Sequence, residues 1–441
     1  MLFSSITFIY YFLPILLLIY FIVPIKFKNF ILLIFSLLFY FYGEPKLIIV
    51  LLLSCFINYI LAIKIEEKKS KFYLVLGLIY NIGQLLYFKY VDFFIENING
   101  IFNLDIDLLK VVMPIGISFF TFQTLSYIID VYKGEVKANR SLLNFSTYVA
   151  LFPQLVAGPI VRYKTVASEL KSRKTSFDLF AEGIKRFIIG LSKKVLIANV
   201  IGELASVMPS TFVGVWIKAI AFTLQIYFDF SGYSDMAIGL GKMFGFNFLE
   251  NFNYPLIASS ITDFWRRWHM SLSSFFKDYV YIPLGGSRVN KLKFYRNLFI
   301  VWFLTGFWHG ASWNFIIWGL YFAIILIIEK KFLLNFLNKT KVIKHIYTLF
   351  IVVISFVIFN DINSLKDMFL LNEIDFINLE TIYYLKNYVI VIVIAILAAT
   401  PICKKISCFK FLEPIYYIGL LIVVTAFLID SSFNPFLYFR F

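Results

Sequence analysis

The chain has 441 residues, of which 61% are hydrophobic, 20% aromatic and only 15% charged. Soluble domains carry roughly 25% charged residues, so this composition excludes a soluble globular protein and predicts an integral membrane protein. The formal net charge of +15 does not indicate nucleic-acid binding, because the basic residues form short clusters between apolar runs, as in cytoplasmic loops. Cys55, Cys403 and Cys408 show no metal-ligand spacing, and we expect no disulfide.

The predicted fold is an all-α polytopic membrane protein. Residues 1–23 have no basic segment before their apolar run and no small-residue cleavage site, so we expect a first membrane helix rather than a removed signal peptide. A helix needs ~20 apolar residues to span a bilayer, and such runs predict about 11 to 13 membrane helices. The runs begin near Ile6, Phe30, Leu47, Phe72, Val111, Ile188, Val213, Leu298, Gly319, Ile346, Tyr388 and Ile415.

The charges of the loops predict the orientation of the helices. Lys26 and Lys28 follow the first run, and four lysines follow the third, whereas the loop after the second is nearly uncharged. Because positive loops stay on the cytoplasmic side, we expect the N-terminus outside. The acid-rich segment 361–380 should face outward, and the C-terminus should also lie outside.

Two segments do not fit simple membrane helices. Residues 143–160 are apolar but contain Pro153, Gly158 and Pro159, between two basic loops. This favours a re-entrant element beside a cavity, because broken backbone at membrane depth must be covered by protein or water; an ordinary proline-kinked helix is the alternative. Residues 259–278 mix charged and aromatic side chains, which predicts an amphipathic piece at the interface or along the cavity.

Residues 227–255 hold polar side chains in an apolar context. Asp229, Tyr233 and Asp235 lie there among aromatics and glycines. Polar side chains in membrane segments usually face the protein interior or a hydrated cavity. We therefore expect these three to shape a polar lining, although hydrogen bonding between packed helices explains them equally well.

His309 is the strongest catalytic candidate. It interrupts the apolar run 301–320, and an ionisable group at membrane depth is costly, which points to function. A neutral imidazole, favoured by apolar surroundings, can take a proton from an alcohol during acyl transfer. Trp308 and Trp313 are placed to wall the site, and Ser312 and Asn314 to orient the ring or a carbonyl. The structural alternative is a histidine hydrogen-bonded between helices.

His269 is the second of only three histidines and lies in the charged segment 259–278. Its neighbours Arg266 and Arg267 fit an anionic, phosphate-bearing thioester donor. The alternative is a solvated amphipathic face, in which Asp263 and Arg267 pair across one helical turn. No serine or cysteine has the context of a covalent nucleophile, so direct transfer is the simpler mechanism and an acyl-enzyme the other. His345 reads as a loop residue.

Several motifs closely resemble the membrane-bound O-acyltransferase (MBOAT) family, in particular its alginate O-acetyltransferase branch. They cover about residues 112–320 and occur in the family's order. The motifs are residues 152–163, 225–241, 263–272 (Asp-Phe-Trp-Arg-Arg-Trp-His-Met-Ser-Leu), 278–288 and 308–313 (Trp-His-Gly-Ala-Ser-Trp).

This resemblance implies a helical fold around a central funnel, with N-terminal helices in residues 1–110, the catalytic core in 111–328 and C-terminal helices in 329–441, all in one membrane domain. It implies that His309 matches the family's catalytic histidine and His269 its second motif histidine. It also implies acetyl-CoA as donor, no metal and no bound cofactor. The residues expected to contact substrate are Arg266, Arg267, Trp268, Trp308, Ser312, Asn314, Asp229, Tyr233, Asp235 and Gln154.

The family's activity would be O-acetylation of a cell-envelope polysaccharide of alginate, peptidoglycan or cellulose type. The expected setting is a bacterial inner membrane, with an extracytoplasmic acyltransferase partner that completes transfer to the glycan. Two alternatives stay open: D-alanyl transfer to teichoic acid, which shares the Arg-Trp-His-Met-Ser-Leu and Trp-His-Gly elements, and transport of a glycan across the membrane.

Overall fold

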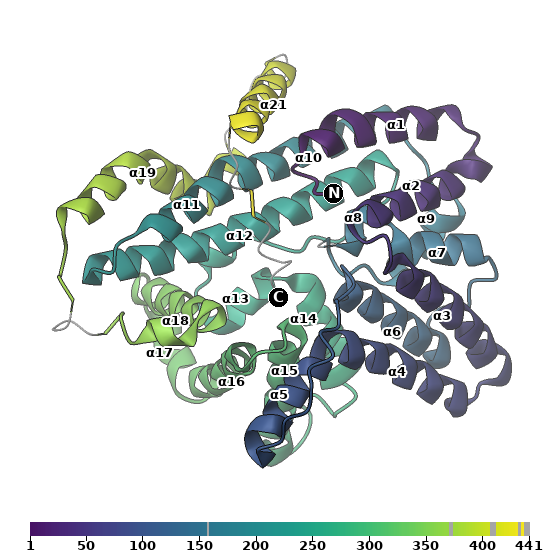
Figure 1. Ribbon diagram of the computed structural model, residues 1–441, viewed down its shortest axis with the longest axis horizontal. Coiled ribbons are helices and arrows are strands. Elements are labelled where there is room, and N and C mark those ends of the chain that lie inside the picture. Colours follow the sequence, from purple (N-terminus) through teal and green to yellow (C-terminus); the bar gives the residue numbers. More distant parts are fainter. Residues whose placement is uncertain (157, 370–373, 406–411, 431–433, 436–441) are drawn as a thin grey trace. The chain divides into compact units, whose positions relative to one another are not determined.

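The computed structural model of the chain describes residues 1–156, 158–369, 374–405, 412–430 and 434–435. The regular elements within these ranges are all helices (Figure 1), which confirms the predicted all-α fold. Seven helical segments among them are long and apolar enough to cross a membrane, so the chain is a polytopic membrane protein. They are Ile25–Gly43, Ile48–Lys68, Lys71–Phe102, Phe212–Met243, Ile343–Asn360, Leu379–Ala398 and Glu413–Asp430.

The number of such helices is smaller than the about 11 to 13 predicted from apolar runs. Other predicted runs do form helices, but these are shorter or more polar: α6 (Ile117–Lys133), α10 (Phe177–Ser192), α15 (Lys291–His309) and α16 (Trp313–Ile328). Length and apolar composition alone do not assign them to the bilayer. The predicted central funnel stays a prediction.

The described residues form two compact units. The first comprises Met1–Phe187 and Met236–Leu249, and the second comprises Ile188–Asp235 and Glu250–Phe441. The long helix α12 (Phe212–Met243) contributes residues to both. The sequence divides the chain into consecutive segments, with boundaries near residues 110 and 328, whereas the two units are defined by contacts between residues. The predicted boundaries therefore stay a prediction.

Buried amides hold helices of the first unit together. Asn58 of α3 (Ile48–Lys68) and Asn81 of α4 (Lys71–Leu85) donate to each other's side-chain oxygens, at 3.1 and 2.7 Å, and Thr124 of α6 donates to Asn81 at 2.7 Å. Polar side chains between membrane helices must find partners within the protein. The other helices of this unit are α1 (Leu13–Ile22), α2 (Lys28–Gly43), α5 (Val91–Phe102), α7 (Leu142–Ala150), α8 (Phe152–Leu155), α9 (Tyr163–Lys171) and most of α10.

The segment 143–160 is broken, as its prolines predict. Helix α7 ends at Ala150, and the single turn α8 begins at Phe152 with Pro153 in its first turn. Proline fits the first turn of a helix because its missing N–H has no intrahelical partner there. The residues on both sides of the break are buried. Entry and exit on one side of the membrane stay a prediction.

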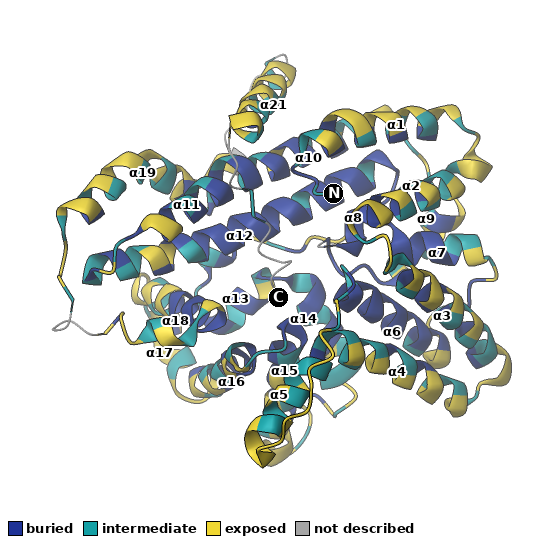
Figure 2. Ribbon diagram, viewed as in Figure 1, coloured by how far each residue is buried: buried dark blue, intermediate teal, exposed yellow. Residues whose placement is uncertain are grey.

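The second unit carries both histidines of the motifs. Its core joins aromatic side chains of α12, α13 (Ile261–Arg267), α15, α16 and α18 (Ile343–Asn360). In Figure 2, α12 is largely buried, whereas α19 and α21 are exposed over most of their length, as expected of helices that face lipid. Besides α12, α15 and α16, the helices are α11 (Val200–Val207), α13 (Ile261–Arg267), α14 (Met270–Phe276), α17 (Leu334–Lys339), α18 (Ile343–Asn360), α19 (Leu379–Ala398), α20 (Ile402–Lys405) and α21 (Glu413–Asp430).

Candidate active site

A tight helical hairpin positions His309, which is the last residue of α15. Asn290 caps the start of α15 by accepting a hydrogen bond from the backbone N–H of Lys293 at 2.9 Å. After a three-residue turn, Ser312 caps α16 by accepting from the N–H of Asn314 at 3.4 Å. Local sequence thus determines where α15 ends and where α16 begins, and His309 is the last residue of α15.

Two glycines bring α15 and α16 into direct backbone contact. A Cβ atom at Gly306 would lie 2.2 Å from the carbonyl oxygen of Phe315, and one at Gly319 would lie 2.3 Å from that of Trp302. Real side chains do not tolerate such distances, so only glycine allows this approach. The close packing holds the end of α15 against α16 and therefore fixes His309 beside Trp318.

Aromatic rings surround the imidazole of His309. The ring centroids of Trp308, Trp318 and Phe359 lie at 5.0, 5.0 and 5.3 Å, all three in edge-to-face arrangement. Only 9% of the residue's surface is exposed. Hydrogen bonds strengthen where water is excluded, so a substrate group that reaches this ring would be held firmly.

His269 lies in the turn between α13 and α14, and only 1% of its surface is exposed. Phe230 packs edge-to-face on its ring at 4.8 Å, and Trp308 lies at 6.1 Å. Trp308 is therefore a neighbour of both imidazoles. Burial lowers the pKa of His269 from 6.5 to about 3, with no contribution from a charged group. This ring is neutral at physiological pH.

Asn251 is the hydrogen-bonding partner of His269. Its Oδ1 atom lies 3.1 Å from Nδ1 of His269, and it also accepts from the backbone N–H of Ser271 at 3.2 Å and from the Ser271 hydroxyl at 2.9 Å. The backbone oxygen of Asn251 accepts from the N–H of Met270 at 2.9 Å. Asn251 therefore contacts the His269 ring through its side chain and the following residue, Met270, through its backbone.

A pocket of about 250 Å³ opens between α13, α14, α15 and α16. Three cations line it, and none of them forms an ion pair with any residue that the structure describes: Arg266, Lys277 and Lys330. Burial chiefly lowers the pKa of Lys330, with Glu329 opposing the shift and Arg266 adding to it. The walls are apolar: Trp265, Leu272, Phe276, Leu298, Trp302 and Leu326.

The two arginines that the sequence groups together have different surroundings. Arg267 forms the predicted ion pair with Asp263, Nε to Oδ1 at 2.9 Å, and donates to the backbone oxygen of Asn253. Arg266 instead lines the pocket. Trp268 is buried, stacked on Phe264 with ring centroids 5.5 Å apart. Contacts of Arg267 and Trp268 with substrate stay a prediction.

The aspartates of α12 bind lysines. Lys194 Nζ lies 2.7 Å from Oδ1 of Asp229, with both side chains almost fully buried, and Lys193 Nζ lies 2.6 Å from Oδ2 of Asp235. These ion pairs correspond to the helix-packing role weighed from the sequence. Tyr233 between them is fully buried. A polar lining formed by these three residues stays a prediction.

The remaining candidate residues have local roles in the structure. Ser312 and Asn314 form the cap of α16 described above. Gln154, in the first unit, is buried and donates from Nε2 to the backbone oxygen of Tyr148. None of these contacts tests the predicted binding of substrate.

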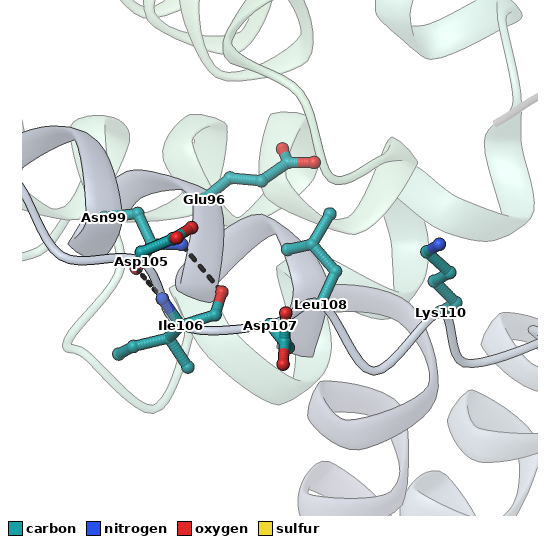
Figure 3. A pocket seen from close by; sticks show the side chains of 7 residues that line it. All are labelled: Glu96, Asn99, Asp105, Ile106, Asp107, Leu108 and Lys110. Carbon is teal, nitrogen blue, oxygen red and sulfur yellow. Dashed lines mark hydrogen bonds between the residues drawn. The ribbon is translucent and has the colours of Figure 1, made fainter.

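A larger cavity, of about 650 Å³, belongs to the first unit (Figure 3). It lies along the loop after α5, where Asn99 donates to the backbone oxygen of Ile106 and accepts from its N–H. Glu96, Asp105, Asp107 and Lys110 line it. Across the described ranges, no three histidine, cysteine or acidic side chains gather in a way that would hold a metal ion.

Sequence reasoning missed three residues of the second unit. Asn251 stands in the polar segment 227–255, but nothing in its spacing links it to His269. Lys194 lies in an apolar stretch beside Lys193 and reads as the end of a basic cluster. Phe359 is one of 54 phenylalanines, so no signal in the chain distinguishes it.

Fold and site together define a helical membrane protein in which two buried histidines share an aromatic neighbour. The sequence profile described as "MBOAT, membrane-bound O-acyltransferase family" matches residues 135–364. The chain belongs to this family, as its motifs predict, and it is an O-acyltransferase.

Three proteins of known name are similar to this chain to different degrees. The probable alginate O-acetylase AlgI of Pseudomonas aeruginosa is 42% identical over 373 residues, covering 81% of this chain and 72% of the relative. The peptidoglycan O-acetyltransferase of Helicobacter pylori is 39% identical over 373 residues, covering 75% and 71%. The teichoic acid D-alanyltransferase of Bacillus subtilis is more distant, at 32% over 228 residues, covering 48% and 58%.

Proposed function

We propose that this protein transfers the acetyl group of acetyl-CoA toward hydroxyl groups of a cell-envelope polysaccharide, with His309 as the catalytic base. The observation that carries the proposal is the position of His309, which is buried among three aromatic rings at the end of α15 and shares Trp308 with His269. Relatives named for acetylation of alginate and peptidoglycan support the acetyl group and the class of acceptor.

In the proposed reaction, an acceptor hydroxyl attacks the thioester carbonyl while His309 takes the hydroxyl proton. The new C–O bond forms as the C–S bond breaks, and the imidazolium returns its proton to the leaving thiolate of coenzyme A. Atoms and charge balance without a covalent acyl-enzyme. A relay, in which the acetyl group rests on a residue before it reaches the final glycan, adds a second step of the same kind.

The pocket beside α13 suits the donor's phosphate-bearing end. Arg266, Lys277 and Lys330 supply positive charge, and the apolar walls suit the pantetheine arm. Trp265 of the wall lies 5.6 Å from Trp318, whose ring in turn lies 5.0 Å from His309. The pocket and His309 are therefore connected through the packed rings of Trp265 and Trp318.

Removal of a pocket cation should weaken binding of acetyl-CoA specifically. We expect Arg266→Gln to raise the KM for acetyl-CoA by about tenfold, as loss of one charge-assisted contact costs ~1.4 kcal/mol or more. Acetyl-pantetheine lacks the phosphates, so its KM should not change. Steady-state hydrolysis or transfer by the purified protein measures both constants.

Arg288→Gln is the matched control for this experiment, because Arg288 is an exposed arginine outside the pocket. If Arg266→Gln changes the KM of both donors equally, or of neither, the pocket does not hold the phosphates.

The proposed setting is a bacterial inner membrane with the N-terminus outside, where a second, extracytoplasmic protein completes the transfer. The alternation of basic and nearly uncharged loops supports this orientation. Mass spectrometry of envelope glycans from a strain that lacks the protein identifies the acceptor. Loss of D-alanyl esters rather than acetyl esters would favour teichoic acid, and glycan movement without consumption of a thioester would favour transport.

A further inference from the structure

The carboxamide of Asn251 has a defined orientation. The atom that faces Ser271 receives the backbone N–H of Ser271 at 3.2 Å and its hydroxyl at 2.9 Å. A backbone N–H can only donate, so this atom must be the carboxamide oxygen and not the nitrogen. The same oxygen lies 3.1 Å from Nδ1 of His269.

This orientation fixes the proton of His269. A carboxamide oxygen carries no proton, and the Ser271 hydroxyl, 3.5 Å from Nδ1 of His269, donates its own proton to this oxygen at 2.9 Å. Nδ1 of His269 must therefore carry the hydrogen in its contact with Asn251. In a neutral imidazole the other nitrogen is then an acceptor. That nitrogen, Nε2, is buried and has no hydrogen-bond partner among the residues that the structure describes.

The backbone around the histidine is held on both sides. His269 has a φ of +43°, in the left-handed region that non-glycine residues seldom adopt. The N–H of Met270 donates to the backbone oxygen of Asn251, and the N–H of Asn253 donates to that of Arg267, both at 2.9 Å. An uncommon backbone conformation persists only where its surroundings enforce it, so these two bonds to segment 251–253 hold the backbone of the turn that carries His269.

We infer that Asn251 is a positioning residue that holds His269 as the Nδ1–H tautomer, so that Nε2 accepts a hydrogen bond from a second hydroxyl group of the acyl acceptor, beside the one whose proton His309 takes. A buried acceptor without a partner costs free energy, and a hydroxyl donor is what satisfies it. The role assigned to the hydroxyl rests on the proposed function. The assignment of the tautomer rests only on the hydrogen bonds of Asn251.

The groups that face His269 favour the neutral ring. Phe230 of α12 and Trp308 of α15 pack on it, and both are uncharged. The titratable residues next to them in sequence are Asp229, which forms an ion pair with Lys194, and His309. The pKa of about 3 keeps Nε2 free of a proton throughout the range in which unperturbed histidines titrate.

Nitrogen NMR of the full-length protein in nanodiscs tests the tautomer directly. The chain has only three histidines, so comparison of labelled wild type with His269→Gln assigns the signals. We expect a protonated, pyrrole-type Nδ1 and a pyridine-type Nε2 whose shifts stay constant from about pH 5 to 8. A proton on Nε2, or titration near the usual histidine pKa, would overturn the inference.

Activity of Asn251 variants tests what the tautomer does. In Asn251→Asp, a carboxylate beside Nδ1–H favours the imidazolium, which makes Nε2 a donor. We expect acetyl transfer at low pH to fall by about 10²-fold, as a histidine in the wrong protonation state loses its role, and to recover as the pH rises and Nε2 loses its proton. Asn251→Leu removes the oxygen, so it should stay impaired at every pH.

Ser271→Ala is the matched comparison, because it removes the hydroxyl that donates to Asn251 and lies 3.5 Å from Nδ1 of His269, while the bond between Asn251 and His269 and the backbone N–H of Ser271 remain. Its pH profile should follow that of the wild type. An Asn251→Asp protein that is folded, by its thermal unfolding, and has the wild-type pH profile would refute a role of Asn251 in acyl transfer. If the wild type itself transfers no acetyl group, the proposed function fails, and the NMR result still decides the tautomer.

Discussion

Replacement of His309 by alanine is expected to lower acetyl transfer by a factor of about 10² to 10⁴, the range that positioned general bases contribute. The physical reason is that the three rings packed on His309, those of Trp308, Trp318 and Phe359, cannot take a proton in its place. Transfer of radiolabelled acetyl from acetyl-CoA by protein in nanodiscs measures the loss.

The design of this experiment separates chemistry from packing. His309→Gln keeps most of the side-chain volume and a polar end but has no basic nitrogen, so it should be as inactive as alanine. His345→Gln is the control, because His345 lies in the first turn of α18, not in the predicted loop, and its Nδ1 lies 3.1 Å from the backbone oxygen of Ala258. Full activity of a folded His309→Ala protein would remove His309 from the mechanism.

The fold class could be predicted from the sequence because its causes are local, whereas the break between α15 and α16 falls inside the apolar run 301–320, whose composition does not indicate it. Low charge and long apolar runs predict membrane helices. The end of α15 and the start of α16 depend on residues within one turn, namely His309, Gly310 and Ser312. The pair of Asp263 and Arg267 likewise follows from helical spacing alone.

The surroundings of the histidines could not be predicted, because they join residues far apart in the chain. Asn251 reaches His269 across 18 positions, and Phe359 reaches His309 from α18. The separation of Arg266 from Arg267 also depends on tertiary structure: one side chain turns to the pocket of α13–α16 and its neighbour to Asp263. Sequence patterns show that such residues are polar or aromatic, but not which partner each meets.

The buried ion pair of the second unit gives the largest expected effect on stability. Lys194→Met leaves the Asp229 carboxylate buried without its cation and also removes the donor to Asn199 and to the backbone oxygen of Pro435. Removal of one partner of a buried ion pair costs about 3–5 kcal/mol. Unfolding of the purified protein by sodium dodecyl sulfate should shift by a corresponding amount.

Two further variants show whether this loss comes from the charge. Lys194→Met combined with Asp229→Leu removes both charges, and it should recover most of the stability, since apolar replacement of a buried pair is often neutral. Lys193→Met breaks the more exposed pair with Asp235, whose side chains are 24% and 13% accessible, and should cost less. A double variant as unstable as Lys194→Met alone would contradict the electrostatic explanation.

The same double variant decides what Asp229 does. If it folds and transfers acetyl groups at the wild-type rate, then the Asp229 carboxylate is not needed for transfer, and its role is in helix packing. If it folds but its KM for the acceptor rises, the carboxylate contacts substrate as well as lysine. Because stability and KM are measured on one protein, the structural role and the binding role of Asp229 can be told apart.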